Sequence, residues 1–337
     1  MRANRKLEHL ENYLKSEYIG DNLFEDVFIE HSSLPELSLD EIDMSASFLG
    51  KKISYPIMID AMTGGIKEAE EINESLSKLA REFNIPMAVG SETIALEDFN
   101  TRSFELVGKN LKDKIKIGNL SAKCGLEEVN KAISLIDADA IELHLNFCQE
   151  LIMPEGDRDF RGILDNIENI VNGSKVPVIV KEVGFGISLD SARALYERGV
   201  RYINISGHGG TNFIEIEDLR NEEEDFSDLY HWGNPSAKIL IDYKNNLNKD
   251  DLFIISSGGI KTSLDILKSF ALGADLVSIS GELLKYLAHG GEEYARMYLN
   301  SLINKLRILM LLTGKKNVKQ LKEIKYKTVG RLKDLTE

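Results

Sequence analysis

The chain has 337 residues, 43% of them hydrophobic, and a formal net charge of −14 from 41 basic and 55 acidic side chains. Such a length and composition can bury a full core, so we expect a single domain spanning residues 1–337. The acidic balance argues against a nucleic-acid or anionic-membrane partner, because surfaces that bind those partners are usually basic, and a small anionic substrate would need a local basic pocket.

The first 49 residues do not follow the repeating pattern of the rest and are predicted to be an N-terminal extension that caps the substrate site. A helix from about residue 5 to residue 14 would bring Arg5, Lys6 and His9 onto neighbouring turns. Such a patch in an acidic chain either forms a solvated helix face or binds an anion, and both interpretations stay open at this point.

Short β-branched apolar runs then recur, and a segment of helical periodicity follows most of them, which is the pattern of repeated βα units. Eight parallel strands with intervening helices can close on themselves, and runs that are apolar throughout fit strands buried on both faces. We therefore predict an α/β fold of the (β/α)8 TIM-barrel type, with strands at residues 53–62, 86–91, 114–121, 140–146, 176–183, 202–207, 253–259 and 276–281.

Helical periodicity is clearest at residues 67–83, 188–198, 262–272 and 293–312, which should form part of the outer ring. Residues 212–248 are acidic and are predicted to be an insert after strand six that covers the active site. Residues 312–337 form a basic and polar C-terminal extension, whose simplest interpretation is a solvated tail.

Polar and small residues end the first three strands, where barrel active sites lie. Strand one ends in Ala61, Met62 and Thr63 before two glycines, so a flat ring could lie against its backbone. Ser91 and Asn119 add uncharged hydrogen-bonding groups. Each residue alone is more often a turn former, but together they outline a polar barrel mouth.

The densest polar cluster follows strand four. His144 and Asn146 share one strand face, and Gln149 and Glu150 follow in the loop. The set can bind a diphosphate through His and Gln while Glu150 holds a bridging Mg²⁺. A single histidine here would more often be a satisfied core residue. Cys148 is interpreted as a packing residue, because no base is assigned beside it.

Lys181 lies near the end of strand five, where a buried strand would normally carry an aliphatic side chain. A lysine pointing inward needs an anionic or polar partner. That partner is either a core carboxylate, Glu182 or Glu142, or the electron-rich edge of a reduced flavin.

Glycine-rich turns end strands six, seven and eight. The segment from Ser206 to Thr211 and the turns at residues 256–261 and 278–281 allow backbone N–H groups to approach an anion. Two such turns on consecutive strands favour phosphate binding over ordinary turns.

These motifs resemble those of the type 2 isopentenyl diphosphate isomerases, a family of FMN-dependent barrels. The resemblance covers essentially the whole chain and rests on Arg5, Lys6, His9 and residues 61–65, and on HLNFCQELIMPEGDRDF (144–160), KEVGFG (181–186), GHGGT (207–211), SGGIK (257–261) and LTGKKNV (312–318). The first of these segments is the most specific, whereas SGGI occurs in many FMN barrels.

The resemblance implies FMN contacts at two groups of residues. The ring and ribityl group would lie against Ala61, Met62, Thr63, Ser91, Asn119, Lys181, Ser206 and Thr211, and the phosphate against Gly259, Ile260, Lys261, Ser280 and Gly281. It also implies that Glu150 binds Mg²⁺ and that the diphosphate substrate is held by Arg5, Lys6, His9, His144, Asn146 and Gln149.

The activity implied is a 1,3-allylic proton shift that converts isopentenyl diphosphate into dimethylallyl diphosphate in isoprenoid biosynthesis. Reduced FMN would act as acid and base through N5, with His144 and Gln149 beside the reacting group and NAD(P)H needed only as reductant. Two cysteines and no basic-then-apolar leader indicate a reducing cytoplasm. Family members commonly form tetramers or octamers, so we expect a homo-oligomer.

Two positions depart from the family pattern. Thr93 stands where the family usually has an arginine, which puts one diphosphate contact in doubt, and Lys261 replaces a common arginine but keeps the charge.

The nearest alternative is an FMN-dependent oxidoreductase of the hydroxy-acid oxidase type. Such enzymes need a histidine base with a neighbouring arginine late in the barrel, and residues 256–284 contain neither. An inosinate-type dehydrogenase would need a cysteine in the strand-six loop, which this chain lacks. A barrel without catalysis would be purified colourless and would not take up FMN.

Overall fold

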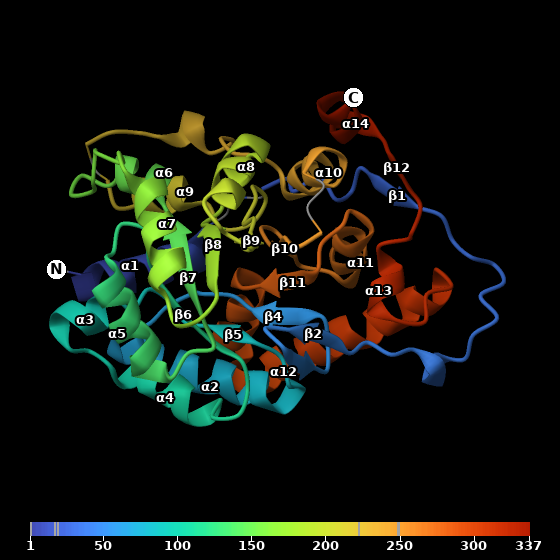
Figure 1. The fold of residues 1–337 in the computed structure, drawn as a ribbon, viewed down its shortest axis with the longest axis horizontal. Coiled ribbons are helices and arrows are strands. Elements are labelled where there is room, and N and C mark those ends of the chain that lie inside the picture. Colours follow the sequence, from blue (N-terminus) through green and yellow to red (C-terminus); the bar gives the residue numbers. More distant parts are fainter. Residues whose placement is uncertain (1, 17, 19, 222, 248–249) are drawn as a thin grey trace.

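The computed structural model describes residues 2–16, 18, 20–221, 223–247 and 250–337. Eight parallel strands form one closed barrel, and β11 pairs with β4 to close it through Ile279 and Ile59 (Figure 1). The strands are β4 (Ile57–Ile59), β5 (Met87–Ala88), β6 (Lys116–Ser121), β7 (Ala140–Leu145), β8 (Val178–Glu182), β9 (Tyr202–Asn204), β10 (Phe253–Ser256) and β11 (Leu276–Ile279). All eight lie inside the predicted runs, so the barrel prediction is confirmed.

The first predicted strand is too long at its start. Residue Ile53 belongs to β3 (Lys51–Ile53), which pairs with β2 (Ala46–Phe48) as an antiparallel hairpin. Phe48 and Ile53 are buried against the lower barrel core. The β2–β3 hairpin therefore closes the end of the barrel at which the strands begin, opposite the predicted site. A closed ring of strands would otherwise leave its apolar interior open at that end.

The outer helices include α2 (Lys67–Phe83), α4 (Arg102–Asn110), α5 (Leu126–Ile136), α7 (Ile163–Gly173), α8 (Leu189–Glu197), α10 (Ser236–Asn246), α11 (Ser263–Ala271) and α12 (Gly281–Leu312). The four helices with the clearest periodicity are confirmed. The last begins at Gly281, and non-helical backbone at Gly290 and Gly291 breaks it into two parts.

The predicted insert at residues 212–248 is too long. It contains α10, the barrel helix that connects β9 to β10, and α10 buries Ala237, Ile239 and Leu240. Its acidic part holds α9 (Phe213–Asp218) and a 3-10 turn at Ser227–Leu229, while residues 222 and 248 lie outside the described chain.

The barrel interior consists of two layers with the strand period of two. The lower layer is apolar and includes Met58, Ala88, Ile117, Ala140, Ile179, Ile255 and Leu276. Two residues further along six of these strands the side chains become polar although they stay buried, and on β9 Asn204 likewise follows Tyr202. The polar residues are Asp60, Asn119, Glu142, Lys181, Asn204, Ser257 and Ser278. Because side chains alternate along a strand, each polar residue lies above the apolar one on the same face. The polar layer is the floor of the site.

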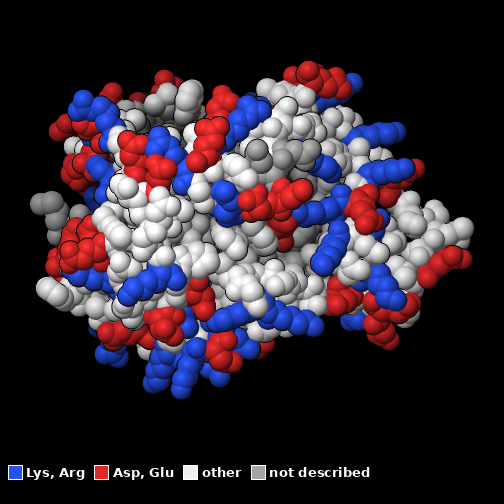
Figure 2. Space-filling model, in the orientation of Figure 1, with Lys and Arg blue, Asp and Glu red and all other residues white. Residues whose placement is uncertain are grey.

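The face drawn in Figure 2 carries acidic and basic side chains side by side, without an extended basic area. None of the helices in the described ranges is long and apolar enough to cross a bilayer.

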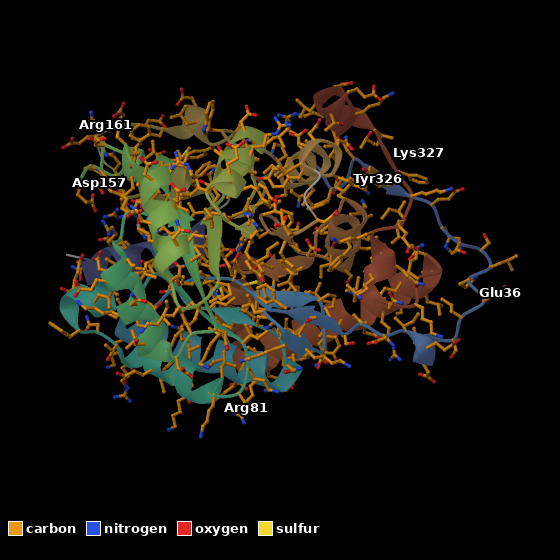
Figure 3. The ribbon with its side chains drawn as sticks, viewed as in Figure 1. Glu36, Arg81, Asp157, Arg161, Tyr326 and Lys327 are labelled. Carbon is orange, nitrogen blue, oxygen red and sulfur yellow. The ribbon has the colours of Figure 1, made fainter. Side chains whose placement is uncertain are left out.

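The C-terminal tail is packed against the barrel rather than solvated. It contains α13 (Val318–Leu321), β12 (Tyr326–Thr328) and α14 (Gly330–Thr336), and β12 pairs with β1 (Val27–Ile29) of the N-terminal extension. Tyr326 and Lys327 mark this strand in Figure 3. Leu321 and Leu332 are fully buried. The solvated interpretation is wrong because a few apolar residues anchor a mainly polar segment.

Candidate functional site

One cavity of about 590 Å³ opens at the C-terminal ends of the barrel strands. This volume lies within the usual range for small-molecule and cofactor sites. The cavity is lined by every predicted site residue: Arg5, Lys6, His9, Ala61, Met62, Thr63, Ser91, Asn119, His144, Asn146, Gln149, Glu150, Lys181, Ser206, Thr211, Gly259, Ile260, Lys261, Ser280 and Gly281. The structure therefore brings together groups from the N-terminal extension and from all eight strand ends.

His144 is held by Asn119 on the neighbouring strand, with Nδ1 of the imidazole 2.8 Å from Oδ1 of the amide. The amide nitrogen of Asn119 donates a hydrogen bond to Glu142, which leaves the amide oxygen of Asn119 as the acceptor facing His144. The imidazole of His144 must therefore carry its proton on Nδ1. Loss of solvation, together with the positive charges of Lys181 and Lys6, lowers the pKa of His144 to about 3. The ring is therefore neutral near pH 7.

The floor beneath the cavity contains two buried carboxyl groups, of which the sequence indicated Glu142 but not Asp60. Asn204 donates to Asp60 at 3.0 Å and to Glu142 at 3.3 Å, and so links two buried carboxyl groups. Burial, and then the proximity of Asp60, raise the pKa of Glu142. The period of two along β4, β7 and β9 could have revealed this layer, because all three residues face inward.

Among the described residues Lys181 forms no ion pair with Glu182 or Glu142, the two core carboxylates that were one of its expected partners. Its positive charge only opposes the rise in the pKa of Glu142. Its Nζ donates to the Glu182 backbone carbonyl at 2.9 Å. The Glu182 carboxylate instead accepts backbone N–H groups from residues 183–186. Lys181 stays buried at the cavity wall, where its charge is available to a bound group.

The polar cluster after β7 lies on the short helix α6 (Phe147–Ile152) and its flanks. Glu150 accepts from Asn146 through Oε1 at 2.9 Å and from the Asp157 backbone through Oε2 at 3.0 Å. Asp157 is labelled in Figure 3 on the loop that follows α6. The described residues contain no cluster of three potential metal ligands. One carboxylate fits only an Mg²⁺ ion that takes its other ligands from water and substrate oxygens.

Helix α1 (Arg2–Lys15) lies over the cavity and is bound to α9 by a buried carboxylate that was not predicted. Glu217 Oε1 lies 2.7 Å from both His9 Nε2 and Gln149 Nε2. Burial opposes ionisation of Glu217, but contacts with His9, Gln149 and Arg220 outweigh it and its pKa is lowered. Arg220 also pairs with Glu8 of α1 at 2.7 Å. The acidic insert thus positions substrate-site candidates on two other elements.

The remaining basic candidates of α1 make fixed contacts. Lys6 donates to the carbonyl oxygens of Gly64 at 2.6 Å and Ser91 at 2.7 Å. Arg5 lies 3.5 Å from Glu155. Thr93, at the departure from the family pattern, hydrogen-bonds the Ser91 hydroxyl at 3.0 Å and leaves no cation in that place.

The turns after β10 and β11 have the properties of a phosphate cradle. The backbone N–H groups of Gly259 and Ile260 make no hydrogen bond among the described residues. Gly258 and Gly259 have φ of +93° and +74°, and a Cβ at either would overlap backbone of the strand-six loop. Ser280 and Gly281 add the N-terminus of α12. Free donors and close backbone approach suit an anion.

Comparison with known proteins identifies the family to which this chain belongs. Residues 140–328 match the FMN-dependent dehydrogenase family. An isopentenyl-diphosphate delta-isomerase of Geobacillus sp. (strain WCH70) is 40% identical over 327 residues, covering 96% of this chain and 92% of the relative. The isomerase of the same name from Bacillus licheniformis is 41% identical, covering 96% and 92%.

Solved structures are similar in fold. A mandelate oxidase crystallised with (S)-mandelic acid superimposes with a TM-score of 0.69 at 16% identity, covering 96% of this chain and 94% of the oxidase. At that identity the likeness concerns the barrel and carries no assignment of substrate.

Proposed function

Because this chain belongs both to the FMN-dependent dehydrogenase family and to the isopentenyl-diphosphate delta-isomerases, we propose that it is the FMN-dependent isomerase that converts isopentenyl diphosphate into dimethylallyl diphosphate in isoprenoid biosynthesis. The observation that carries the proposal is the shared cavity. It combines a phosphate cradle at Gly259 and Gly281 with a histidine and cation set under α1.

The reaction moves a proton from one carbon of an allyl unit to another without net redox change. Reduced FMN, when bound, would supply the acid and base at N5, and its electron-rich ring would stabilise the carbocation-like transition state. The protein would bind and orient the substrate and would exclude water from the cavity. α1 serves the last purpose, because it covers the cavity and is anchored through Glu217 and Arg220.

The diphosphate would be held by Arg5, Lys6, His9, His144, Asn146 and Gln149. The neutral His144 ring has its proton on Nδ1, so Nε2 has none to donate. An anion beside the ring favours its charged form, so diphosphate binding would raise the pKa of His144 and favour a proton at Nε2. Gln149 is oriented by its hydrogen bond to Glu217.

Glu150 would hold an Mg²⁺ ion that also binds diphosphate oxygens. Its two oxygens already accept from Asn146 and from the Asp157 backbone, which fixes the carboxylate for the ion. This arrangement matches the preference of Mg²⁺ for one or two carboxylates together with water and substrate phosphates.

The flavin ring would lie over Ala61, Met62 and Thr63, with Ser91, Asn119, Ser206 and Thr211 as neutral partners. Lys181 would place its charge beside the anionic edge of the reduced ring. Ile260, Lys261 and Ser280 would complete the phosphate site. NAD(P)H would serve only as reductant, and a tetramer or octamer is the assembly we propose.

The hydroxy-acid oxidase alternative draws support from the shared fold and from the match to the FMN-dependent dehydrogenase family. The segment from β10 to the first turns of α12 lacks the histidine and arginine pair on which that oxidation depends. We therefore place the isomerase first.

An anaerobic assay with isopentenyl diphosphate, FMN, NADPH and Mg²⁺ tests the proposal. Omitting the flavin, the reductant or the metal in turn should abolish or strongly reduce product. If the protein shows no isomerase activity but oxidises an α-hydroxy acid in a second assay that supplies O2 as electron acceptor, the isomerase is rejected in favour of the oxidase.

A further inference from the structure

The N-terminal extension contacts both turns of the phosphate cradle, and not only the substrate side of the cavity. On α1, Tyr13 packs against Gly281, where an added Cβ would overlap the Tyr13 hydroxyl oxygen. Further along the chain, Asn22 donates from Nδ2 to the Gly259 carbonyl at 2.7 Å. Each of these residues reaches a different strand end.

The Tyr13 hydroxyl has no hydrogen-bond partner within the described chain, although the residue lines the cavity. Burial, and then the Glu282 carboxylate, raise the pKa of Tyr13, so its hydroxyl stays protonated and can donate. The Lys285 ammonium lies 5.4 Å from the centre of the ring and holds it by a cation–π contact. A positioned and unused donor therefore faces the N-terminus of α12.

Asn22 determines the shape of the other turn. It packs against Gly209 and Gly259, and its own carbonyl accepts from Ala237 of α10 at 3.1 Å. Fixing the Gly259 carbonyl also fixes the peptide planes beside it, and the free N–H groups of Gly259 and Ile260 belong to this turn.

We propose that Tyr13 donates a hydrogen bond to the phosphate of FMN, and that Asn22 holds the Gly259 turn in the conformation that receives the same phosphate. This inference rests on the proposed flavin function and extends the cofactor site to a helix that the resemblance assigns to substrate alone. A neutral donor suits this position, since Lys261, Lys285 and Glu282 already provide charge around it.

The placement links cofactor to substrate binding. Arg5, Lys6 and His9 lie on the same helix as Tyr13. A phosphate bound by Tyr13 stabilises α1 over the cavity, and a docked α1 binds the phosphate more tightly, because coupling between two sites is reciprocal. FMN should therefore stabilise the docked α1, and with it the substrate site, more than a flavin without the phosphate does.

The test compares FMN with riboflavin, which has the same ring without the phosphate. Dissociation constants are measured by quenching of flavin fluorescence for the wild type, Tyr13→Phe, Asn22→Ala and the control Tyr286→Phe on α12. We expect Tyr13→Phe to weaken FMN binding about tenfold, as for loss of a hydrogen bond to a charged group. Riboflavin binding should stay within about twofold, and Tyr286→Phe should leave both constants unchanged.

Unchanged or tighter FMN binding in Tyr13→Phe would overturn the inference, as would an equal loss for both flavins. A wild type that binds neither flavin would instead reject the flavin function itself. Hydrogen exchange gives a second measurement. FMN should slow exchange in residues 4–15 of the wild type more than riboflavin does, and Tyr13→Phe should remove the difference. Equal protection by both flavins in the wild type would contradict the coupling.

Discussion

Nδ1 of His144 lies 2.8 Å from Oδ1 of Asn119, and this contact joins the substrate side of the cavity to the floor beneath it. Asn119 lies on β6 and His144 on β7, and Asn119 in turn donates to Glu142 at 3.1 Å. The ring orientation and tautomer of His144 thus depend on the buried carboxyl layer, which no motif of the sequence contains.

His144 should make the fold sensitive to acid. Its pKa is lowered from 6.5 to about 3 in the folded chain, so the unfolded chain takes up a proton first as the pH falls. The stability contributed by the neutral ring is complete above pH 6.5 and declines below it, by about 1.5 kcal/mol between pH 6.5 and 5. Urea unfolding at both pH values should show a smaller decline in His144→Gln. The exposed His289→Gln serves as control, and an identical decline in both variants would contradict the assignment.

Glu150→Gln should remove Mg²⁺-dependent activity without affecting flavin binding. The substitution keeps the shape but removes the charge that would hold Mg²⁺, so activity should fall at least tenfold and lose its dependence on the ion. Flavin absorbance of the purified variant should match the wild type. Glu127→Gln, on the exposed pair with Lys131, is the control. Loss of bound flavin in Glu150→Gln would place this residue in the cofactor site instead.

Lys181→Met should weaken flavin binding. The buried ammonium of Lys181 lies at the cavity wall and donates a hydrogen bond to a backbone carbonyl. The substitution would therefore remove one charged contact from a bound flavin. We expect about a tenfold higher dissociation constant by fluorescence quenching. Lys78→Met, exposed on α2, should not change it. A fully yellow variant with wild-type activity would refute the role.

Leu332→Ala should destabilise the whole barrel although it lies near the C-terminus. Leu332 is fully buried, and its truncation should cost about 2–4 kcal/mol in the free energy of unfolding. Leu335, 41% exposed on the same helix α14, is the matched control and should change stability by about 0.5 kcal/mol or less when replaced by alanine. Equally small changes in the free energy of unfolding in both variants would support the interpretation of the C-terminal segment as a solvated tail.

Most of the barrel could be predicted because local rules determine it. Strands such as Ile57–Ile59, Val178–Glu182, Phe253–Ser256 and Leu276–Ile279 are rich in apolar β-branched residues. A strand buried on both faces has that composition wherever it pairs. Strand ends in glycine and polar residues mark the mouth for the same reason, since parallel strands place those ends together. The candidate site residues could therefore be named without coordinates.

Other features depended on contacts between distant segments. Glu217 looks like one more acidic residue of a charged insert, yet it lies beneath α1 and joins His9 to Gln149. The pairing of β1 with β12 and the contact of Tyr13 with Gly281 likewise join opposite ends of the chain. No local pattern encodes such partners.

The sequence by itself determined the closed barrel, the position of its mouth and the residue types gathered there, because strand periodicity and turn chemistry act over a few residues. Only the tertiary structure decided which charges are buried, which donors remain free, and that the extensions pack on the barrel. Burial and electrostatic shifts are properties of the space around a group, and segments hundreds of residues apart create that space here.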